Sequence, residues 1–289
     1  MEYKPQERYK IVDKIDISDV ISKHIIYAPF IASSAKPGNF VILMKDEKSE
    51  RIPVTLVDFD RVNGTITVII QSIGKSTAEI NLMKKGDSFL NVSGPLGTPV
   101  EIKKWGTVVG VGGGVGIAEL YPIAKAFKEA GNKVISILGA RSKDLLILED
   151  ETIKISDEVL ITTDDGSSGK KGVVTDAIKE LYTRGEKIDA VFTIGPLVMM
   201  KFVSLTTKPY NTPTFASLNP IMLDGTGMCG GCRIEIDGQF KFACVDGPMF
   251  DAHKVNFDSL MKRNNGFKDF EKQSISEFER THKCKIGLH

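Results

Sequence analysis

The sequence predicts a β + α/β fold, in which an antiparallel β-barrel is followed by a doubly wound parallel sheet and a small C-terminal region. Three observations lead to this prediction. Short runs rich in β-branched residues fill residues 1–102, strands alternate with helices over residues 103–218, and three cysteines cluster within residues 219–289. We therefore expect three regions with these boundaries.

The composition is that of an ordinary soluble globular protein. The 289 residues are 42% hydrophobic and 26% charged, with a formal net charge of +1. This balance gives no electrostatic reason to expect nucleic acid or an anionic membrane as a partner. The charged N-terminus shows no secretory signal, and no apolar run reaches the ~20 residues that span a bilayer. We therefore expect a cytoplasmic protein.

The first region reads as a series of short strands. Turn residues punctuate it at Lys36-Pro37-Gly38, Asn63-Gly64 and Gly86-Asp87. The strand-like stretches are YKIVDKIDIS, HIIYAPF, NFVILMK, IPVTLVDFD and TITVIIQSI. About six strands at this spacing, with one short helical piece near 76–83, predict a small antiparallel barrel. The simplest interpretation of this region is a structural β-domain.

From residue 106 the pattern changes to strand, loop and helix. A buried strand over 106–112 precedes a helix over 117–130, in which Ile117, Leu120 and Phe127 recur at helical spacing. Further strands are expected at 133–139, 158–163, 190–195 and 212–218, with helices near 172–184 and 197–206. This alternation predicts a parallel, doubly wound sheet.

The loops that follow these strands are rich in glycine and small polar residues. They comprise residues 112–116, 140–142, 164–169 and 195–196. In a doubly wound sheet, ligands bind in the crevice at the carboxyl ends of the strands. Four such loops facing one crevice favour a nucleotide as the ligand.

The glycine loop Gly112-Gly113-Gly114-Val115-Gly116 lies between a strand and a helix. Without Cβ atoms the backbone can approach a pyrophosphate, which the helix N-terminus also favours. The run is not a true G-x-G-x-x-G, and Arg141 stands where an acidic residue commonly reads the ribose. By itself, the loop could also be a tight connection.

The loop TTDDGSSGKKG also has two interpretations. It is either a solvated turn or a segment near a ribose or nicotinamide. The full set of candidate nucleotide-binding residues is Gly112, Gly113, Gly114, Val115, Gly116, Arg141, Asp165, Gly166, Ser167, Gly195 and Pro196.

The third region holds a cysteine cluster and then a charged helical tail around 256–281. Cys229, Cys232 and Cys244 nearly match the spacing of a plant-type [2Fe–2S] site, and Asp224 stands where that pattern has its first cysteine. A carboxylate can bind iron, so we expect the metal ligands Asp224, Cys229, Cys232 and Cys244. Two alternatives remain open, namely Cys284 as the fourth ligand and a structural zinc site made of the same residues. His253 is expected to be a packing or surface histidine.

The order of these parts resembles the ferredoxin–NADP reductase superfamily. More narrowly, it is similar to the electron-transfer subunits of dihydroorotate dehydrogenase. It resembles still more closely the small subunits of NADH-dependent ferredoxin:NADP oxidoreductases, also known as sulfide dehydrogenase subunits. The resemblance is carried by ERIPVTL, IGKSTAEI, LMKKGD, VSGPLG, GVGGGVGIAELYPIAKA, ISILGARSKDLL, TTDDGSSGKKG, ASLNPIMLDGTGMCGGCR and FACVDGP. Asp224 in place of a cysteine points to the oxidoreductase small subunits.

The resemblance implies an FAD between the first two regions. One departure is visible, since related subunits often have arginine directly before the proline, where this chain has Ile52. Without the resemblance, RIPVT would be read as another barrel strand. The implied FAD-binding residues are Arg51, Pro53, Val54, Thr55, Ile70, Gln71, Gly74, Ser76 and Thr77.

The resemblance also implies an oxidoreductase subunit in which NAD(H) meets the flavin and electrons pass on to the [2Fe–2S] cluster. Cofactors would carry the chemistry, which fits the lack of an evident catalytic triad. Arg141 could accept a 2′-phosphate and favour NADP, but the family pattern favours NAD(H) for this subunit.

A further implication is a larger flavin- and [4Fe–4S]-containing partner. In this family the pair couples NADPH oxidation to the reduction of NAD and ferredoxin by electron bifurcation, and ferredoxin is reached only through the partner. One alternative is the electron-transfer subunit of a dihydroorotate dehydrogenase. Another is a nucleotide-binding regulatory module with a structural zinc site.

Overall fold

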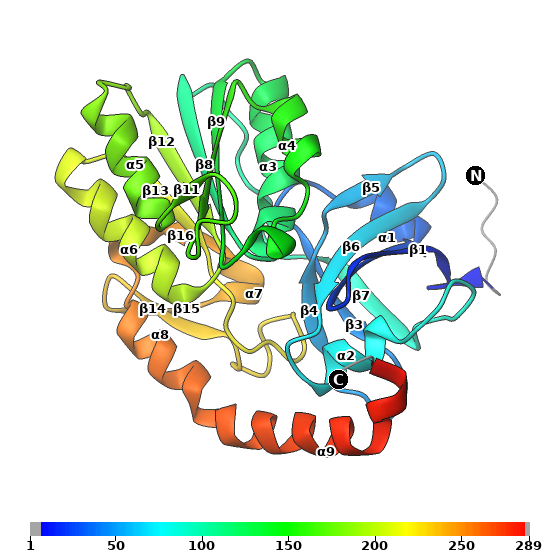
Figure 1. The fold of residues 1–289 in the computed structure, drawn as a ribbon. Coiled ribbons are helices and arrows are strands. Elements are labelled where there is room, and N and C mark those ends of the chain that lie inside the picture. The colour runs from blue at the N-terminus through cyan, green and yellow to red at the C-terminus, as the bar shows by residue number, and fades with distance from the viewer. Residues whose placement is uncertain (1–6, 287–289) are drawn as a thin grey trace.

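The computed structural model describes residues 7–286, apart from the side chains of residues 281–286. Figure 1 shows two bodies side by side, with the β-rich N-terminal part next to a larger α/β part. A long C-terminal helix runs beneath both. No described helix is both long and apolar enough to cross a membrane.

The N-terminal body consists of two antiparallel sheets around one core. One sheet has the strand order β1-β2-β6-β5 and the other β4-β3-β7. The strands are β1 (Ile11–Ser18), β2 (Ile21–Tyr27), β3 (Phe40–Met44), β4 (Ile52–Thr55), β5 (Asp58–Asp60), β6 (Thr65–Gln71) and β7 (Asn91–Leu96), with helices α1 (Pro29–Ser34) and α2 (Lys75–Asn81). Alternate residues of both sheets, such as Val41, Leu43, Ile66 and Val68, fill the core. The antiparallel β-domain is therefore confirmed.

The α/β body is a seven-stranded sheet with the order β11-β10-β9-β8-β12-β13-β16. Its strands are β8 (Thr107–Gly113), β9 (Lys133–Ala140), β10 (Glu158–Thr163), β11 (Lys170–Lys171), β12 (Ala190–Ile194), β13 (Thr214–Ser217) and β16 (Met249–Asp251). All pairs are parallel except β13 with β16. The strand order reverses at β8, where a doubly wound sheet places its ligand. The predicted α/β class is confirmed.

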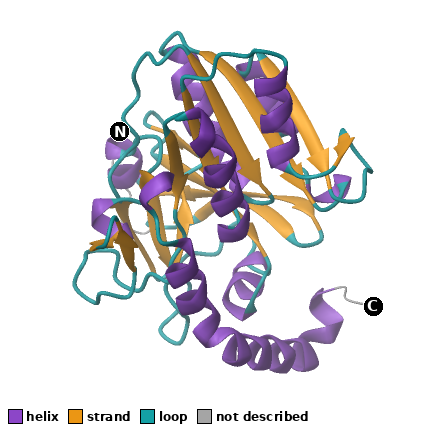
Figure 2. Ribbon diagram, turned by 90° about the vertical axis from the view of Figure 1, so that its left-hand side faces the viewer, coloured by secondary structure: helices purple, strands orange, loops and turns teal. Residues whose placement is uncertain are grey.

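Helices cover both faces of this sheet (Figure 2). They are α3 (Gly116–Glu129), α4 (Glu149–Ile155), α5 (Val174–Thr183) and α6 (Leu197–Thr207), with short 3₁₀ turns at Lys143–Leu145 and Lys208–Tyr210. Val108 of β8 packs toward Leu120 and Phe127 of α3. Val109 and Val111 pack on the opposite face with α5. Strand alternation thus divides the core into two layers.

The cysteine region is built into the α/β body. It contains the hairpin β14 (Arg233–Ile236) and β15 (Gln239–Phe242), the short helix α7 (Ala243–Asp246), and β16, which joins the sheet. A 3₁₀ turn at Ala252–Lys254 leads to α8 (Phe257–Asn264), and another at Asn265–Phe267 leads to α9 (Lys268–Ile286). Helix α8 packs on α6, and α9 crosses to contact α2 of the barrel. The tail therefore joins the two bodies.

Candidate functional site

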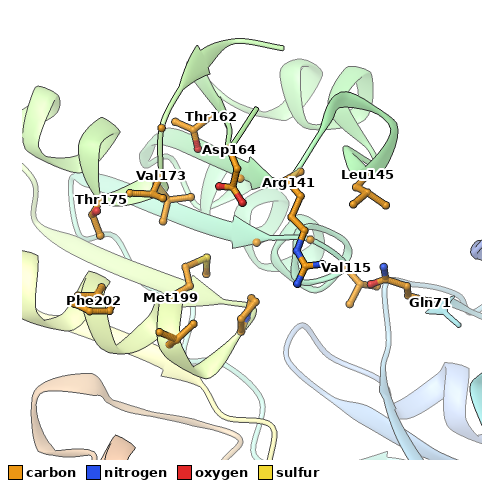
Figure 3. A pocket seen from close by; sticks show the side chains of 18 of the residues that line it. Gln71, Val115, Arg141, Leu145, Thr162, Asp164, Val173, Thr175, Met199 and Phe202 are labelled. Carbon is orange, nitrogen blue, oxygen red and sulfur yellow. The ribbon is translucent and has the colours of Figure 1, made fainter. Parts of the chain in front are cut away.

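A cavity of about 800 Å³ lies where the carboxyl ends of the parallel strands face the barrel. The glycine loop is in its wall, and the barrel closes one side (Figure 3). The lining residues are Ile21, Gln71, Ile73, Gly113, Gly114, Val115, Gly139, Ala140, Arg141, Leu145, Thr162, Asp164, Gly172, Val173, Val174, Thr175, Pro196, Val198, Met199 and Phe202. The cavity sits at the switch point of the sheet, which is the usual ligand position in this architecture.

The two ends of the cavity differ. Gln71, which comes from the barrel, lies at one end with Val115, whereas Thr175 and Phe202 lie at the other (Figure 3). The backbone of Gly113 and Gly114 borders the cavity along this path. An extended ligand lying here would therefore touch the barrel at one end and helices α5 and α6 at the other.

The five residues of the glycine loop have different structural roles. Gly113, Gly114 and Val115 line the cavity, and Gly114 has φ +56° with its N–H bonded to the Gly139 carbonyl at 2.8 Å. Gly116 lies behind, where a Cβ atom would be only 2.4 Å from the Ile194 carbonyl oxygen. Gly112 is also confined, since its Cβ would meet Ile117 Cα at 2.9 Å. The outer glycines therefore allow α3 to pack closely on the sheet, and the inner ones expose backbone to a ligand.

The third loop places Asp164, rather than Asp165, in the cavity wall. Asp165 bonds to the N–H and hydroxyl of Ser167 at 2.9 and 2.6 Å, and these bonds lower the pKa of its carboxyl. The Ser167 hydroxyl in turn accepts from the Lys143 N–H. Asp165, Gly166 and Ser167 therefore shape the loop without lining the cavity. In the sequence, the position of Asp164 directly after the strand EVLITT is the signal that could have identified it as a cavity residue.

Arg141 and Asp164 project into the cavity from the ends of β9 and β10 (Figure 3). These strands are parallel neighbours in the sheet. Pro196 also lines the cavity, whereas Gly195 lies just outside the lining. A Cβ at Gly195 would lie 2.9 Å from the Gly113 carbonyl oxygen, so this glycine allows β8 and β12 to end side by side.

The residues implied for FAD lie on β4 and directly before it, at the end of β6, and at the start of α2 and directly before it. Gln71 alone among them lines the large cavity. The Thr77 hydroxyl accepts from the N–H groups of Ile73 and Gly74, which fixes the turn into α2. Ser76 donates to Glu50. A second cavity of about 500 Å³ lies beside α2 and is lined by Lys45, Asp46, Glu47, Lys48, Ser49, Lys75 and Glu79.

Glu119 lies where the α/β body meets the barrel, and the sequence did not single it out. Its carboxyl, in the first turn of α3, bonds to the side chain of Thr55 on β4. Burial raises the pKa of Glu119 from 4.5 to about 7, and the bond to Thr55 opposes this rise. Nearby, Ile117 packs against Val57 and Ile69 of the barrel. A carboxyl that titrates near neutral pH therefore lies beside a strand implied in flavin binding.

The cysteine loop brings three thiols and one carboxylate into a single segment. Cys232 and Cys244 are buried with their Sγ atoms 3.2 Å apart, whereas Cys229 is exposed and its Sγ accepts from the Gly231 N–H. Asp224 accepts from the N–H groups of Thr226 and Cys229 at 2.8 and 2.7 Å. The loop reverses at Gly225, Gly227 and Gly230, which all have positive φ.

The donor set suits a thiolate-bound metal centre, although the side chains are not arranged as one. No three His, Cys, Asp or Glu side chains within the described residues are grouped to hold a metal ion. Burial and the neighbouring Cys232 thiol raise the pKa of Cys244 to about 12. Forming the Cys244 thiolate is therefore costly, and a bound cation offsets that cost. The side chain of Cys284 lies outside the described part. His253 bonds through Nε2 to the Thr207 hydroxyl at 3.0 Å.

Together, the barrel, the doubly wound sheet and the cavity between them define the fold of the ferredoxin reductases, a class of nucleotide-dependent oxidoreductases. The fold is shared with a cytochrome P450 reductase from Amycolatopsis, at a TM-score of 0.60 and 18% identity over 70% of this chain and 65% of that one. That likeness concerns the fold alone.

Closer comparisons define the family. Residues 219–256 match the model of the iron–sulfur cluster binding domain of dihydroorotate dehydrogenase B. A Thermotoga maritima homologue of the electron-transfer subunit of dihydroorotate dehydrogenase B (NAD(+)) is 50% identical over 94% of this chain and 96% of that protein. The Fusobacterium nucleatum electron-transfer subunit is 32% identical over 86% of this chain and 97% of its own. This chain therefore belongs to the family of dihydroorotate dehydrogenase B electron-transfer subunits and their homologues.

A solved structure in the same family is similar throughout. It is a chain of the NADH-dependent reduced ferredoxin–NADP oxidoreductase, described in connection with flavin-based electron bifurcation. It matches with a TM-score of 0.89 and 49% identity over 94% of this chain and 98% of that one. The resemblance predicted from the sequence is confirmed.

Proposed function

We propose that this chain is an electron-transfer flavoprotein subunit that moves electrons between NAD(H), FAD and a [2Fe–2S] cluster. A larger flavin- and iron–sulfur-containing partner would exchange electrons with it, within an electron-bifurcating NADH-dependent ferredoxin:NADP oxidoreductase. The observation that carries this proposal is the cavity that joins the glycine loop to the barrel at Gln71. The similarity to the bifurcating oxidoreductase chain supports it.

NAD(H) occupies the large cavity in this proposal. The backbone at Gly113 and Gly114, with the start of α3, faces the pyrophosphate, because backbone N–H groups and a helix N-terminus favour anions. Asp164 would accept from a ribose hydroxyl, and Arg141 lines the cavity with it. The end of the cavity at Gln71 would hold the nicotinamide, and the end at Phe202 would hold the adenine. When bound, NAD(H) and FAD supply hydride transfer and the cluster supplies one-electron transfer; the chain holds them in place and excludes water.

The barrel surface from Gln71 toward α2 would hold the FAD in this proposal. Pro53, Val54 and Thr55 of β4, together with Gln71 and the backbone of Ile70 on β6, would contact its ring system, because the Ile70 side chain is buried in the barrel core. The turn at Gly74, Ser76 and Thr77 would approach its phosphates. The second cavity, beside α2, is lined by three lysines and three carboxylates, and Lys45 is paired with Asp46 and Glu79. Arg51 is assigned to FAD by resemblance, although its guanidinium contacts the cysteine loop in the structure.

The cluster is held by Asp224, Cys229, Cys232 and Cys244. The pairing of Cys232 with Cys244 and the single loop from Asp224 to Cys229 support this ligand set. Replacing Asp224 with alanine should cause loss or destabilisation of the cluster, because a ligand and two loop hydrogen bonds are removed together. The Asp224→Asn variant keeps one side-chain oxygen that can accept a hydrogen bond from the loop, and it serves as the comparison for Asp224→Ala. An intact, spectrally unchanged cluster in both variants would reject Asp224 as a ligand.

The partner docks over the cysteine loop in this proposal. Met228, Leu223 and Val245 are exposed there, with Met228 89% accessible, and Phe240 of the hairpin is exposed as well. Such apolar side chains around a redox loop suit a protein partner. The partner is expected to contain flavin and [4Fe–4S] clusters and to pass electrons to ferredoxin. Cysteines that hold an iron–sulfur cluster, together with NAD(H), suit a reducing compartment, so we assign the protein to the cytoplasm.

The alternative function is that of electron-transfer subunit in an NAD-dependent dihydroorotate dehydrogenase. The match of residues 219–256 to the iron–sulfur domain of that enzyme favours it. Affinity purification from the native cell separates the two possibilities. A partner with [4Fe–4S] clusters supports the oxidoreductase, and a flavin subunit that oxidises dihydroorotate supports the alternative.

The experiment that tests the main proposal is an anaerobic visible spectrum of the purified protein, with flavin, iron and zinc measured in the same sample. We expect about one FAD and two irons per chain, with colour bleached by NADH. Stoichiometric zinc without flavin, in protein made with ample iron, would mean that the cysteine loop is a structural site and that the proposal is wrong.

A further inference from the structure

Two arginines from different parts of the fold reach the backbone of the cysteine loop. Arg51, just before β4 of the barrel, donates from Nε to the Leu223 carbonyl at 2.8 Å. Arg263, on α8, donates from one terminal nitrogen to the Gly231 carbonyl at 3.0 Å and to the Gly230 carbonyl at 3.4 Å. Leu223 directly precedes Asp224, and Gly231 directly precedes Cys232. The loop is therefore held at both ends by guanidinium groups.

Each arginine is anchored in its own element. Arg51 also donates to the Ser93 hydroxyl of β7 at 3.4 Å, and that hydroxyl bonds to Asn91 at 2.7 Å. Arg263 follows Leu260, which is buried against the cysteine region, and also reaches the Arg233 carbonyl at 3.4 Å. Neither arginine has a carboxylate partner among the ion pairs of the described residues. The described hydrogen bonds of both guanidinium groups therefore go to uncharged acceptors, which are backbone carbonyls and the Ser93 hydroxyl.

The cysteine loop packs closely against the barrel near Arg51. Gly225 lies so close to the barrel that a Cβ there would be 2.5 Å from Leu96 Cδ1 and 2.8 Å from Ile42 Cδ1. On the far side of the cysteine region, Thr98 donates from its N–H to the Gly247 carbonyl at 2.6 Å and from its hydroxyl to the Val245 carbonyl at 2.9 Å. The loop is thus fixed to the same barrel that carries the strand RIPVT. Arg51 bonds to it from the start of that strand.

We propose that Arg51 and Arg263 are positioning residues of the iron–sulfur centre, which hold the cysteine loop against the barrel and place two positive charges beside it. This inference rests on the proposed function and deepens it. Arginine keeps its charge at all working pH values. Reduction adds one negative charge to the cluster, so nearby cations favour the reduced form. Holding the loop also fixes the path between the flavin strand and the cluster.

The test compares Arg51→Gln, Arg263→Gln and the double variant with Arg51→Lys, all in the full-length holoprotein. Arg61→Gln is the matched control, because Arg61 also donates to backbone carbonyls, those of Ser33 and Ala35, but within the barrel. Two measurements are made. One is the midpoint potential of the cluster, from an anaerobic redox titration followed by electron paramagnetic resonance. The other is amide hydrogen exchange over residues 223–232.

We expect the cluster potential to move to more negative values in each glutamine variant. The shift should correspond to about a threefold loss in the equilibrium constant for cluster reduction in each single variant and about a tenfold loss in the double variant. Exchange over 223–232 should be about tenfold faster, because bonds from a charged donor are lost. Arg51→Lys should restore the potential but not the full protection. Arg61→Gln should leave both readouts unchanged.

Three results would overturn the inference. The first is a potential and an exchange pattern in the double variant equal to those of the parent. The second is a control that shifts as much as the variants. The third is loss of FAD from Arg51→Gln with unchanged loop exchange, which would make Arg51 a flavin ligand. Failure of the proposed function looks different, because the parent itself would then lack flavin and iron. The exchange measurement would still decide whether the arginines hold the loop.

Discussion

At the scale of single residues, Arg141 and Asp164 present opposite charges at the ends of the neighbouring strands β9 and β10. An acidic residue at this edge accepts from a ribose 2′-hydroxyl and repels a 2′-phosphate, whereas an arginine attracts the phosphate. Because both line the same cavity, the preference between NADH and NADPH depends on which of them meets the ribose. The proposal gives that position to Asp164.

Replacing Asp164 with alanine should therefore reduce the preference for NADH over NADPH by about tenfold, equivalent to about 1.4 kcal/mol. The dissociation constants of both nucleotides, measured by fluorescence titration, test this. Asp144→Ala is the control, because Asp144 is exposed near the same loop but does not line the cavity. A preference that is unchanged in Asp164→Ala and shifted in Arg141→Ala would assign the ribose to Arg141.

Glu119 gives the fold a predictable dependence on pH. Its pKa is 4.5 in the unfolded chain and about 7 in the native protein, so the native state binds more protons between these values. The free energy of unfolding therefore falls as pH rises from 4.5 through 7, by at most about 3 kcal/mol from this group. Below pH 4.5 this contribution is fully present.

Glu119→Gln should remove that dependence. The variant should be about as stable as the parent at pH 5 and about 2 kcal/mol more stable at pH 8, measured by urea unfolding at both values. Glu129→Gln is the matched control, since Glu129 is exposed at the other end of α3. A parent and a Glu119→Gln variant that lose stability equally between pH 5 and pH 8 would contradict the raised pKa.

At the scale of elements, the start of α3 is defined by how closely it packs on the sheet. Gly116→Ala would put a methyl group 2.4 Å from the Ile194 carbonyl oxygen, and backbone cannot move aside cheaply. We expect a loss of at least about 2 kcal/mol in stability and much weaker NADH binding, because α3 moves away from β12. Thermal unfolding and NADH titration measure these effects.

Gly266→Ala is the control for this glycine prediction, because a Cβ at Gly266 meets nothing within 4 Å. That substitution should change the melting temperature by little. If Gly116→Ala were as stable as Gly266→Ala and bound NADH normally, the close packing of α3 on β12 would not control the nucleotide site.

At the scale of the whole molecule, helix α9 ties the cysteine region to the barrel by its contact with α2 (Figure 1). Phe278 is only 5% exposed, whereas Phe270 on the same helix is 72% exposed. Phe278→Ala should therefore weaken the packing of α9 and lower the free energy of unfolding by about 3 kcal/mol. Hydrogen exchange along α9 should become faster. Phe270→Ala should leave that exchange unchanged. Equal exchange in both variants would mean that α9 is not held by Phe278.

The sequence by itself determined the parts of this protein that depend on neighbours along the chain. Short runs rich in β-branched residues predicted the barrel strands, the 3.6-residue period over 117–130 predicted α3, and the glycine run at the end of β8 predicted a nucleotide loop. These signals are local, because backbone geometry repeats every two or 3.6 residues. The cysteine spacing was equally readable, since three of the four candidate ligands are cysteines within sixteen positions.

Only the tertiary structure decided which of these residues face one another. It put Asp164 rather than Asp165 in the cavity wall, bonded Glu119 to Thr55, and added β16 of the cysteine region to the parallel sheet. It also joined Arg51 to Leu223, 172 positions apart. No local period encodes such pairs, because they form only when several packed elements fix one another's register and spacing. The local pattern thus predicted what the parts are, and long-range packing determined what each side chain touches.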